Sequence, residues 1–387
     1  MLIAFQVVFL VSLGLLLYSY CIYPLSLGIL ARMFGNPVRM DEAAAPPRVA
    51  VVVPVYNEQE VIRRKIDNLL GLDYPPEKLT IWVGSDCSSD NTSDIVKDLN
   101  NPRVKVWVAE ERGGKTEVIN KLAPTISADV LLFTDANTMH RQDSVRKMMR
   151  FYADPSVGGV AGTIEHRYQN KEVEEVLYRS FESRQKLLES RLHSTISAFG
   201  GFYSVRKEAF TPIQHNAYSN DDVLIPMNVI RRGYRMIFTP DALSSEDTTE
   251  NVKHEFWRRV RIGAGNFQAF FWLLDFLNPL RGWPWFCYVS HKVTRWFSPL
   301  FLVIAFASGF FLTALHGPFL YRLLFAAGCA LIAVACSFLV APLPFVRPLY
   351  YFMSMNTALF FGFFRFLRGI RSAAWTRTER SESNTQA

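Results

Sequence analysis

Cysteine is scarce in this sequence of 387 residues, and four of its 5 cysteines lie in apolar stretches. Only Cys87 lies in a charge-rich part, and no cysteines show the spacing of a zinc site, so neither a disulfide framework nor structural zinc is expected. Charge is absent from residues 1–31, which also lack the basic start and the cleavage site of a signal peptide. We therefore expect residues 1–33 to be a retained transmembrane anchor.

A recognisable nucleic-acid module is also lacking, although the net charge is +7. No nucleic acid is therefore expected as a partner, and membrane lipids explain the charge better. Arginines crowd just beyond the last apolar segment, at Arg365, Arg368, Arg371, Arg377 and Arg380. The positive-inside bias predicts that the basic polar tail, residues 371–387, lies in the cytosol.

Three segments without charge lie near the carboxyl end, within residues 291–370. Residues 297–315 and 323–346 are each long enough to cross a bilayer, which takes about 20 apolar residues. Residues 349–364 are fewer and include Asn356, so spanning, re-entry and an interfacial position all stay open. Three spans here would place the tail opposite the soluble part, so we expect one of the last segments to be re-entrant or interfacial.

Between the apolar ends, short β-branched runs alternate with segments of helical periodicity. Strands are predicted at Val49–Val53, Leu79–Val83, Val104–Val108, Val130–Phe133 and Val157–Val160. The alternation is typical of an α/β fold with a mostly parallel sheet and helices on both faces. A long polar helix is expected from Lys171 to Arg191, and an apolar helix after Asp222 ends before Gly233, a favourable helix stop.

Polar clusters follow three of the predicted strands, where sheets of this kind bind ligands. They are Pro54-Val55-Tyr56-Asn57-Glu58, Ser85-Asp86-Cys87-Ser88-Ser89-Asp90 and Thr134-Asp135-Ala136-Asn137. Asp135 and Asn137 have the spacing of oxygen ligands for a hard divalent cation that phosphate also holds. Alone, this pattern is more often an Asx-turn or helix cap, but the neighbouring clusters favour the cation.

Three other clusters have competing interpretations. Gly113-Gly114-Lys115 suggests a P-loop, but Ala109 replaces a required glycine and two glutamates precede the loop, which disfavours an ATPase. Asp221-Asp222 is either a helix cap or the source of a general base. Arg258-Arg259-Val260-Arg261 is either a solvated stripe or a diphosphate-binding group. The aromatic residues around it predict interfacial amphipathic helices over residues 251–290.

In this order the clusters resemble those of family 2 glycosyltransferases, specifically the membrane synthases of cellulose, hyaluronan and poly-N-acetylglucosamine. The resemblance covers residues 48–300. Its matching positions are the opening motif Val53–Glu58, the uracil-contacting Asp86, the Gly114-Lys115 loop, the metal site Asp135-Ala136-Asn137, the acidic pair Asp221-Asp222 and the arginine motif Arg258–Arg261. Three positions depart from the family, namely Ser85 and Asn137, which replace aspartates, and Ile262, which replaces a tryptophan.

The resemblance implies a cytosolic GT-A domain over residues 48–250 that uses a UDP-sugar and Mg²⁺ or Mn²⁺. It assigns catalysis to Asp221 and Asp222, with Asp222 as general base, and the metal to Asp135 and Asn137. Donor-binding residues would be Pro54, Tyr56, Asn57, Glu58, Asp86, Lys115, Asp135, Arg258 and Arg261. Inverting transfer to a growing polysaccharide is the first expectation, and addition of one sugar to a membrane lipid is the alternative.

The implied setting is a multi-pass protein of the cell membrane, with a bacterial inner membrane expected and a partner subunit for export as a further candidate. A transporter or channel without chemistry is the third class of function considered. It predicts ionisable residues within the spans, and the apolar segments have no charged residues. An enzyme is therefore favoured.

Overall fold

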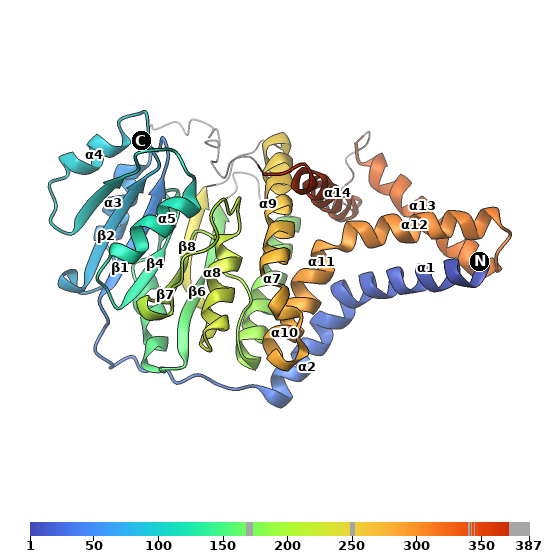
Figure 1. Cartoon of the computed structure of the whole chain (residues 1–387), viewed down its shortest axis with the longest axis horizontal. Helices are drawn as coiled ribbons and strands as arrows, with labels where there is room; N and C mark the ends of the chain where they lie inside the picture. Colours follow the sequence, from blue (N-terminus) through green and yellow to red (C-terminus); the bar gives the residue numbers. More distant parts are fainter. Residues whose placement is uncertain (168–172, 248–251, 340, 342, 344, 371–387) are drawn as a thin grey trace. The chain divides into compact units, whose positions relative to one another are not determined.

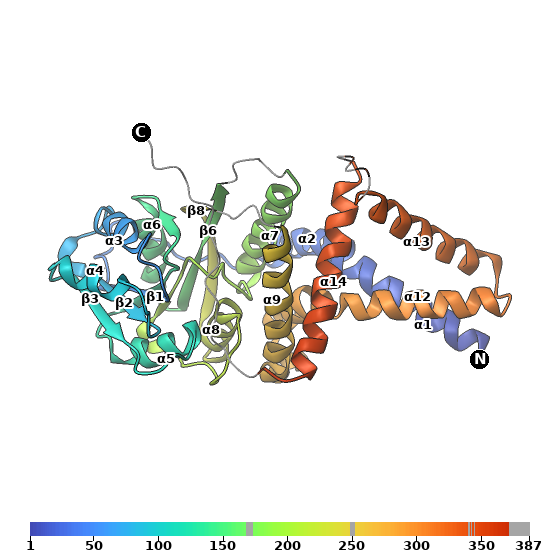
Figure 2. The same cartoon turned by 90° about the horizontal axis from the view of Figure 1, so that it is seen from above.

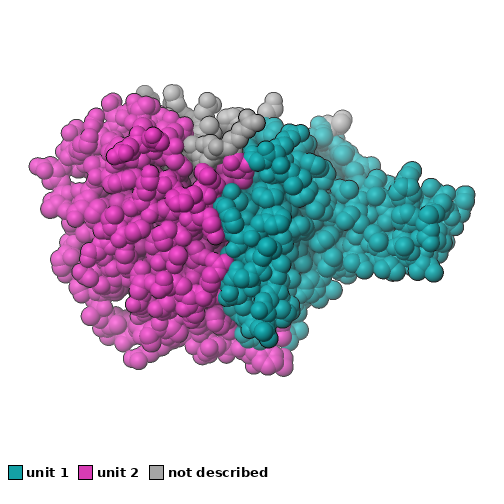
Figure 3. All heavy atoms as spheres, in the orientation of Figure 1, with its two compact units in different colours: residues 1–29, 252–369 teal, residues 30–251, 370–387 magenta. Residues whose placement is uncertain are grey.

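The computed structural model describes residues 1–167, 173–247, 252–339, 341, 343 and 345–370. The chain forms two compact units, shown in different colours in Figure 3. Residues 1–29 and 252–369 make a helical unit, and residues 30–251 and 370–387 make a unit built on a sheet. The tail from residue 371 onward and the start of the predicted polar helix at Lys171 lie outside the described residues.

The sheet unit contains eight strands in the order β3-β2-β1-β4-β7-β6-β8-β5. Their bounds are β1 Val49–Val55, β2 Leu79–Ser85, β3 Val104–Val108, β4 Val130–Phe133, β5 Thr138–His140, β6 Val157–Arg167, β7 Tyr203–Arg206 and β8 Arg235–Asp247. The pairs β1–β2, β1–β4, β2–β3 and β6–β8 are parallel, whereas β7 and β5 pair antiparallel to their neighbours. The sheet is therefore mixed and mostly parallel.

Helices cover both faces of this sheet, with α3 and α6 on one side and α5 and α8 on the other (Figure 2). The helices of the unit are α3 Ile62–Leu70, α4 Thr92–Asp98, α5 Lys115–Thr125, α6 Ser144–Met149, α7 Val173–Leu192 and α8 Asp221–Arg231, with short 3₁₀ turns at Pro76–Lys78, Arg150–Ala153 and Lys207–Ala209. Every residue of β1 is buried, as expected for a central strand covered on both faces. The prediction of an α/β sheet covered on both faces is confirmed.

The strand predictions differ in how well they fit. The runs Val104–Val108 and Val130–Phe133 are strands with those bounds, whereas β6 extends seven residues beyond Val160, to Arg167. The short antiparallel strands β5 and β7 were not predicted. Each has only three or four residues, too few for a periodic pattern, and exists because a longer neighbouring strand supplies its hydrogen bonds.

The helical unit begins with α1 Leu2–Leu17, which continues through a π-helical turn, Tyr18–Ile22, into α2 Tyr23–Phe34 (Figure 1). Its other helices are α9 Val252–Trp272, α10 Trp283–Cys287, α11 Thr294–Trp296, α12 Ser298–Ala314, α13 Phe319–Ser337 and α14 Arg347–Leu367, with 3₁₀ turns at Leu274–Leu277 and Pro279–Arg281 and a second π-helical turn at Tyr288–Val293. Leu2–Phe34 and Phe319–Ser337 are long and apolar enough to cross a membrane. The pair Trp283–Trp296 and Ser298–Ala314, bent by 58°, would be a third crossing if it forms one span.

Helix α14, over the short segment whose position was left open, packs along α9. Arg259 Nη2 donates to the Tyr351 hydroxyl at 2.7 Å. The backbones come so close at Gly362 that a Cβ there would lie 2.8 Å from the Ala264 nitrogen. Asn356 is buried and its Oδ1 accepts a 2.6 Å hydrogen bond from Ser298. The polar residue in this apolar segment is therefore a contact between helices.

Candidate active site

The three predicted polar clusters lie at one edge of the sheet, because β1, β2 and β4 are parallel neighbours. Val55 at the end of β1 pairs with Ser85 at the end of β2, and Val52 pairs with Phe133 at the end of β4. The residues that follow these strands, including Asp86 and Asp135, therefore emerge at the same carboxyl edge. This is the edge at which open α/β sheets bind ligands.

The loops after β1 and β2 hold each other in place. The side-chain carbonyl of Asn57 accepts the Ser89 backbone N–H at 2.8 Å, and the Glu58 backbone N–H donates to the Thr92 hydroxyl at 2.8 Å. Asn57 has a φ of 54°, a conformation that asparagine tolerates better than most residues. Of the opening motif, Pro54 thus lies inside β1, while Asn57 and Glu58 fix the loop beyond it.

Asp86 is fully buried and pins the glycine loop. Its two carboxylate oxygens accept the backbone N–H groups of Gly113 at 2.7 Å and Gly114 at 2.9 Å. Gly114 has a φ of 92°, which favours glycine at this turn. Arg112, the residue before these glycines, places its guanidinium carbon 3.6 Å from the centre of the Tyr56 ring. The structure therefore gives Asp86 a role in loop geometry, and its contact with uracil stays a prediction.

Lys115 connects three of the predicted site segments. It begins α5, and its Nζ lies 2.8 Å from Asp135 Oδ1 and 3.3 Å from Asp221 Oδ2. The same ammonium donates to the Gly200 carbonyl at 3.1 Å. Burial opposes its charge, but the carboxylates of Asp135 and Asp221 outweigh this effect and raise its pKa above the ordinary value. Lys115 is therefore a permanent cation between two carboxylates.

The two aspartates that open α8 have different environments. Asp221 is buried and accepts a 2.9 Å hydrogen bond from the Tyr203 hydroxyl, in addition to its ion pair with Lys115. Asp222 is more exposed, and its Oδ2 would lie 3.7 Å from a Cβ built on Gly200. Asp221 is thus held by its neighbours, whereas Asp222 is the member of the pair that solvent can reach. Sequence reasoning gave no role to Tyr203, which lies in a segment without periodicity.

The Asp135-Ala136-Asn137 loop contributes oxygen donors of the kind that Mg²⁺ and Mn²⁺ prefer. Asn137 Nδ2 donates to Glu246 Oε1 on β8 at 2.8 Å. No group of three or more His, Cys, Asp or Glu suited to a metal occurs among the described residues. A cation held partly by diphosphate oxygens needs only one or two carboxylates, so Asp135 and Asn137 fit such an ion. Sequence reasoning missed Glu246, because nothing in its local pattern links it to Asn137.

A buried lysine lies beneath this loop. Lys65 of α3 is fully buried, and its ammonium donates to the Thr134 hydroxyl at 2.8 Å and to the Thr138 carbonyl. His140 Nε2 lies 3.3 Å from it. Burial lowers the pKa of Lys65 to about 7, although Asp135 and Glu246 act in the opposite direction. The Lys65 side chain therefore holds the residues on either side of the Asp135-Ala136-Asn137 loop, and its ammonium loses a proton more readily than that of an ordinary lysine.

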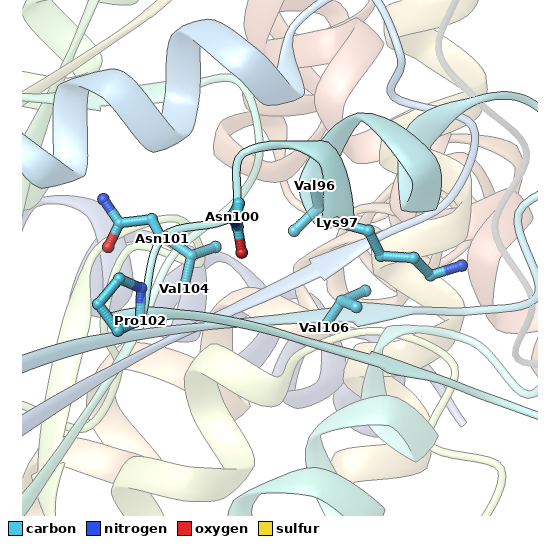
Figure 4. Close-up of a pocket in the computed structure, with 7 residues that line it drawn as sticks. All are labelled: Val96, Lys97, Asn100, Asn101, Pro102, Val104 and Val106. Atoms are coloured by element: carbon cyan, nitrogen blue, oxygen red, sulfur yellow. The ribbon is translucent and has the colours of Figure 1, made fainter.

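Two predicted residues are not placed at this edge. Arg258 and Arg261 belong to α9, in the helical unit, and their contact with a donor stays a prediction. A groove between the end of α4 and the start of β3 is lined by Val96, Asn100 and Val104, among others (Figure 4). It lies toward the amino end of β3 and contains none of the predicted site residues.

Residues 50–213 match the family model described as Glycosyl transferase family 2. The chain carries a family 2 glycosyltransferase domain. It is 23% identical over 232 residues to a dolichyl N-acetyl-glucosaminyl phosphate diacetamido-glucuronosyltransferase of Methanococcus voltae, covering 56% of this chain and 72% of that protein. It is also 24% identical over 243 residues to the poly-β-1,6-N-acetyl-D-glucosamine synthase of Staphylococcus epidermidis, covering 61% of this chain and 57% of the synthase.

Among solved structures, the fold is similar to that of a mannosyltransferase from Pyrobaculum calidifontis, in complex with GDP-Man and Mn²⁺. The TM-score is 0.71 at 22% identity, covering 93% of this chain and 99% of the mannosyltransferase. The glycosyltransferase therefore has a GT-A-like fold, and the predicted family and enzyme class are both confirmed.

Proposed function

We propose that this glycosyltransferase inverts the anomeric centre as it moves one sugar from a nucleoside-diphosphate sugar to an acceptor hydroxyl at the cytosolic membrane face. The observation that carries the proposal is the Lys115 cluster, in which one ammonium joins the carboxylates of Asp135 and Asp221 beside Asp222. This cluster provides a positive charge that can bind a diphosphate and a carboxylate that can remove a proton. Both groups are needed at one edge of the sheet if the acceptor hydroxyl displaces the nucleoside diphosphate in a single step.

In the proposed reaction, the acceptor oxygen forms a bond to the anomeric carbon as the bond to the diphosphate breaks. Asp222 takes the hydroxyl proton, since a hydroxyl attacks poorly until its proton is being removed. Asp221 keeps Lys115 in position, and Lys115 stabilises the charge on the departing nucleoside diphosphate. Mg²⁺ or Mn²⁺, held by Asp135 and Asn137, would supply Lewis-acid neutralisation of that leaving group.

A UDP-sugar is the first candidate for the donor, because Asp86 matches the uracil-contacting aspartate of the family that the sequence resembles. GDP-sugars are the second candidate, because the Pyrobaculum calidifontis enzyme of similar fold was solved with GDP-Man. Release of UDP or GDP from a panel of nucleotide-sugars separates the two candidates directly.

For the acceptor, we favour a membrane lipid that receives a single sugar. The Methanococcus voltae relative is named for a dolichyl phosphate-linked acceptor, and Ile262 replaces the tryptophan of the polysaccharide synthase motif. Synthesis of a polysaccharide is the second candidate, supported by the similarity to the poly-N-acetylglucosamine synthase. Product length distinguishes them, since a lipid carrying one sugar supports the first candidate and a ladder of products the second.

The proposed orientation uses three crossings. The chain crosses the membrane into the cytosol along Leu2–Phe34, leaves it along α12 and returns along α13. This order keeps both the sheet unit and the tail in the cytosol. Helix α14 would then lie at the interface beside α9, which is consistent with its Arg259–Tyr351 contact and with Arg365 and Arg368 near its end. A cysteine at Thr378 that is labelled only from outside the cell would contradict this orientation.

The proposed base is tested with Asp222→Asn. We expect turnover to fall by ~10² or more, because the variant cannot remove the acceptor proton, while nucleotide binding measured by calorimetry stays unchanged. Asp129→Asn is the matched control, since Asp129 pairs with Arg48 at the opposite edge of the sheet. Unchanged turnover in Asp222→Asn would remove this residue from the mechanism.

A further inference from the structure

We propose that Glu246 supplies the carboxylate that Asn137 lacks, so that the divalent cation at the donor diphosphate is held by Asp135, Asn137 and Glu246. This inference rests on the proposed function. The family pattern that the sequence resembles has an aspartate where Asn137 stands, which leaves one carboxylate in the loop. A second one, 109 residues further along the chain, contacts the replaced position.

Strand pairing places Glu246 beside the loop. Thr138 of β5, the residue directly after Asn137, pairs with Glu246 of β8 in the antiparallel ladder. The Asn137 amide nitrogen donates to Glu246 Oε1 at 2.8 Å. The position of Glu246 is thus set by two strands rather than by a loop, and rigid elements position ligands better than loops do.

The electrostatics of the nearby lysine support the same placement. Burial lowers the pKa of Lys65 most strongly, and the two carboxylates that act to raise it are Asp135 and Glu246. Both carboxylates therefore act on a single buried ammonium, although they are far apart in sequence. Two carboxylates and an amide oxygen are a suitable set for Mg²⁺ or Mn²⁺ that also binds phosphate oxygens.

The residue after Asn137 carries an unused hydroxyl. Thr138 is fully buried, and its Oγ1 has no hydrogen-bond partner among the described residues. A Cβ at Gly201 would collide with this oxygen and lie 3.3 Å from Asp135 Oδ2. Glycine at position 201 therefore lets the Thr138 hydroxyl and the Asp135 carboxylate approach its backbone closely. A buried polar atom without a partner calls for an explanation, and water bound to a cation there would provide one.

The competing interpretation is that Glu246 only orients the Asn137 amide. Glu246→Gln separates the two, because the glutamine carbonyl still accepts the amide hydrogen bond but carries no charge. The double variant Asn137→Asp with Glu246→Gln returns one carboxylate to the loop. Asp241→Asn is the control on the same strand, since Asp241 pairs with Arg150 2.7 Å away.

The experiment measures Mn²⁺ affinity by electron paramagnetic resonance, with the full-length protein in detergent and saturating UDP or GDP. We expect Glu246→Gln to weaken Mn²⁺ binding about 10-fold or more, the double variant to recover most of this loss, and Asp241→Asn to bind like the wild type. Asp135→Asn is the reference, and it should lose Mn²⁺ binding most strongly.

Two results would overturn the inference. One is wild-type Mn²⁺ affinity in Glu246→Gln while Asp135→Asn loses binding, which would leave Glu246 only the orienting role. The other is a loss in Glu246→Gln that Asn137→Asp does not recover, which would show that the loss does not come from a missing carboxylate ligand. If Asp135→Asn also keeps wild-type affinity, the proposed donor site itself is wrong. The failure of the inference and that of the proposed function are thus distinguishable.

Discussion

Lys115 and Lys65 lie near the same edge of the sheet, yet their environments shift their pKa values in opposite directions. Lys115 is partly accessible and has the carboxylates of Asp135 and Asp221 within 3.3 Å. Lys65 is fully buried and contacts the Thr134 hydroxyl, the Thr138 carbonyl and His140. No carboxylate of a described residue lies within ion-pair distance of Lys65.

The difference between these two lysines shows that close carboxylates can outweigh burial in setting the pKa of the side chain. Burial disfavours the charged form of both side chains. Two close carboxylates reverse this effect at Lys115, whereas distant ones at Lys65 leave its pKa at about 7. The first lysine is therefore suited to bind an anion directly, and the second to support the backbone of the loop above it.

The largest expected effect comes from Lys115→Met. Removing the ammonium leaves Asp135 and Asp221 without their shared partner and takes positive charge away from the leaving group. We expect kcat/KM to fall by ~10²–10³, the loss seen when one stabilising group is removed from a charged transition state. The measurement is nucleotide release with a saturating acceptor. Lys115→Arg, which keeps the charge, should lose less, and equal losses in the two variants would contradict a role for charge.

Lys65→Met tests the other side of the comparison through the pH dependence of stability. Between about pH 7 and pH 10 the unfolded chain binds a proton at Lys65 that the folded protein has released, so the wild type gains stability as the pH rises. Methionine has no such proton. As the pH rises through this range, the unfolding free energy of the wild type should therefore increase relative to that of Lys65→Met by about 1.4 kcal/mol per pH unit. Thermal unfolding of both proteins at several pH values measures this, and parallel profiles would refute a lowered pKa.

The smallest expected effect belongs to Tyr203→Phe. The hydroxyl of this buried tyrosine donates to Asp221 at 2.9 Å, and its loss should cost about 1.5 kcal/mol of stability, as for other hydrogen bonds to charged groups. Lys115 still contacts Asp221, so nucleotide binding should persist. Denaturant unfolding of the two proteins measures the difference, and equal midpoints would show that Lys115 alone holds Asp221.

Local patterns predicted the parallel half of the sheet well. The runs at Val104–Val108 and Val130–Phe133 are strands with those bounds. Val130–Phe133 is buried throughout, and a strand buried on both faces needs a continuous apolar run, whereas Val104–Val108 is a partly exposed strand at the edge of the sheet. Gly233 follows the end of α8 with a φ of 88°, as its position after an apolar periodic segment indicated. The order of the polar clusters was enough to indicate the glycosyltransferase family.

The contacts that give the site its charge balance could not be predicted in this way. Glu246 meets Asn137 because the antiparallel pairing of β5 with β8 brings together segments 109 residues apart in sequence. Tyr203 of β7 meets Asp221 at the start of α8, a contact between a strand and a helix that no local periodicity indicates. Asp86 accepts two glycine amides rather than standing free at a strand end.

The sequence by itself therefore determined the family, the apolar ends and the edge of the sheet where chemistry should lie, because each depends on local composition and order. Only the tertiary structure decided which carboxylate is held by Lys115, which carboxylate remains accessible, and which lysine is buried against hydroxyl and carbonyl groups. Those properties depend on distances of a few ångströms between segments, and strand register and burial set such distances.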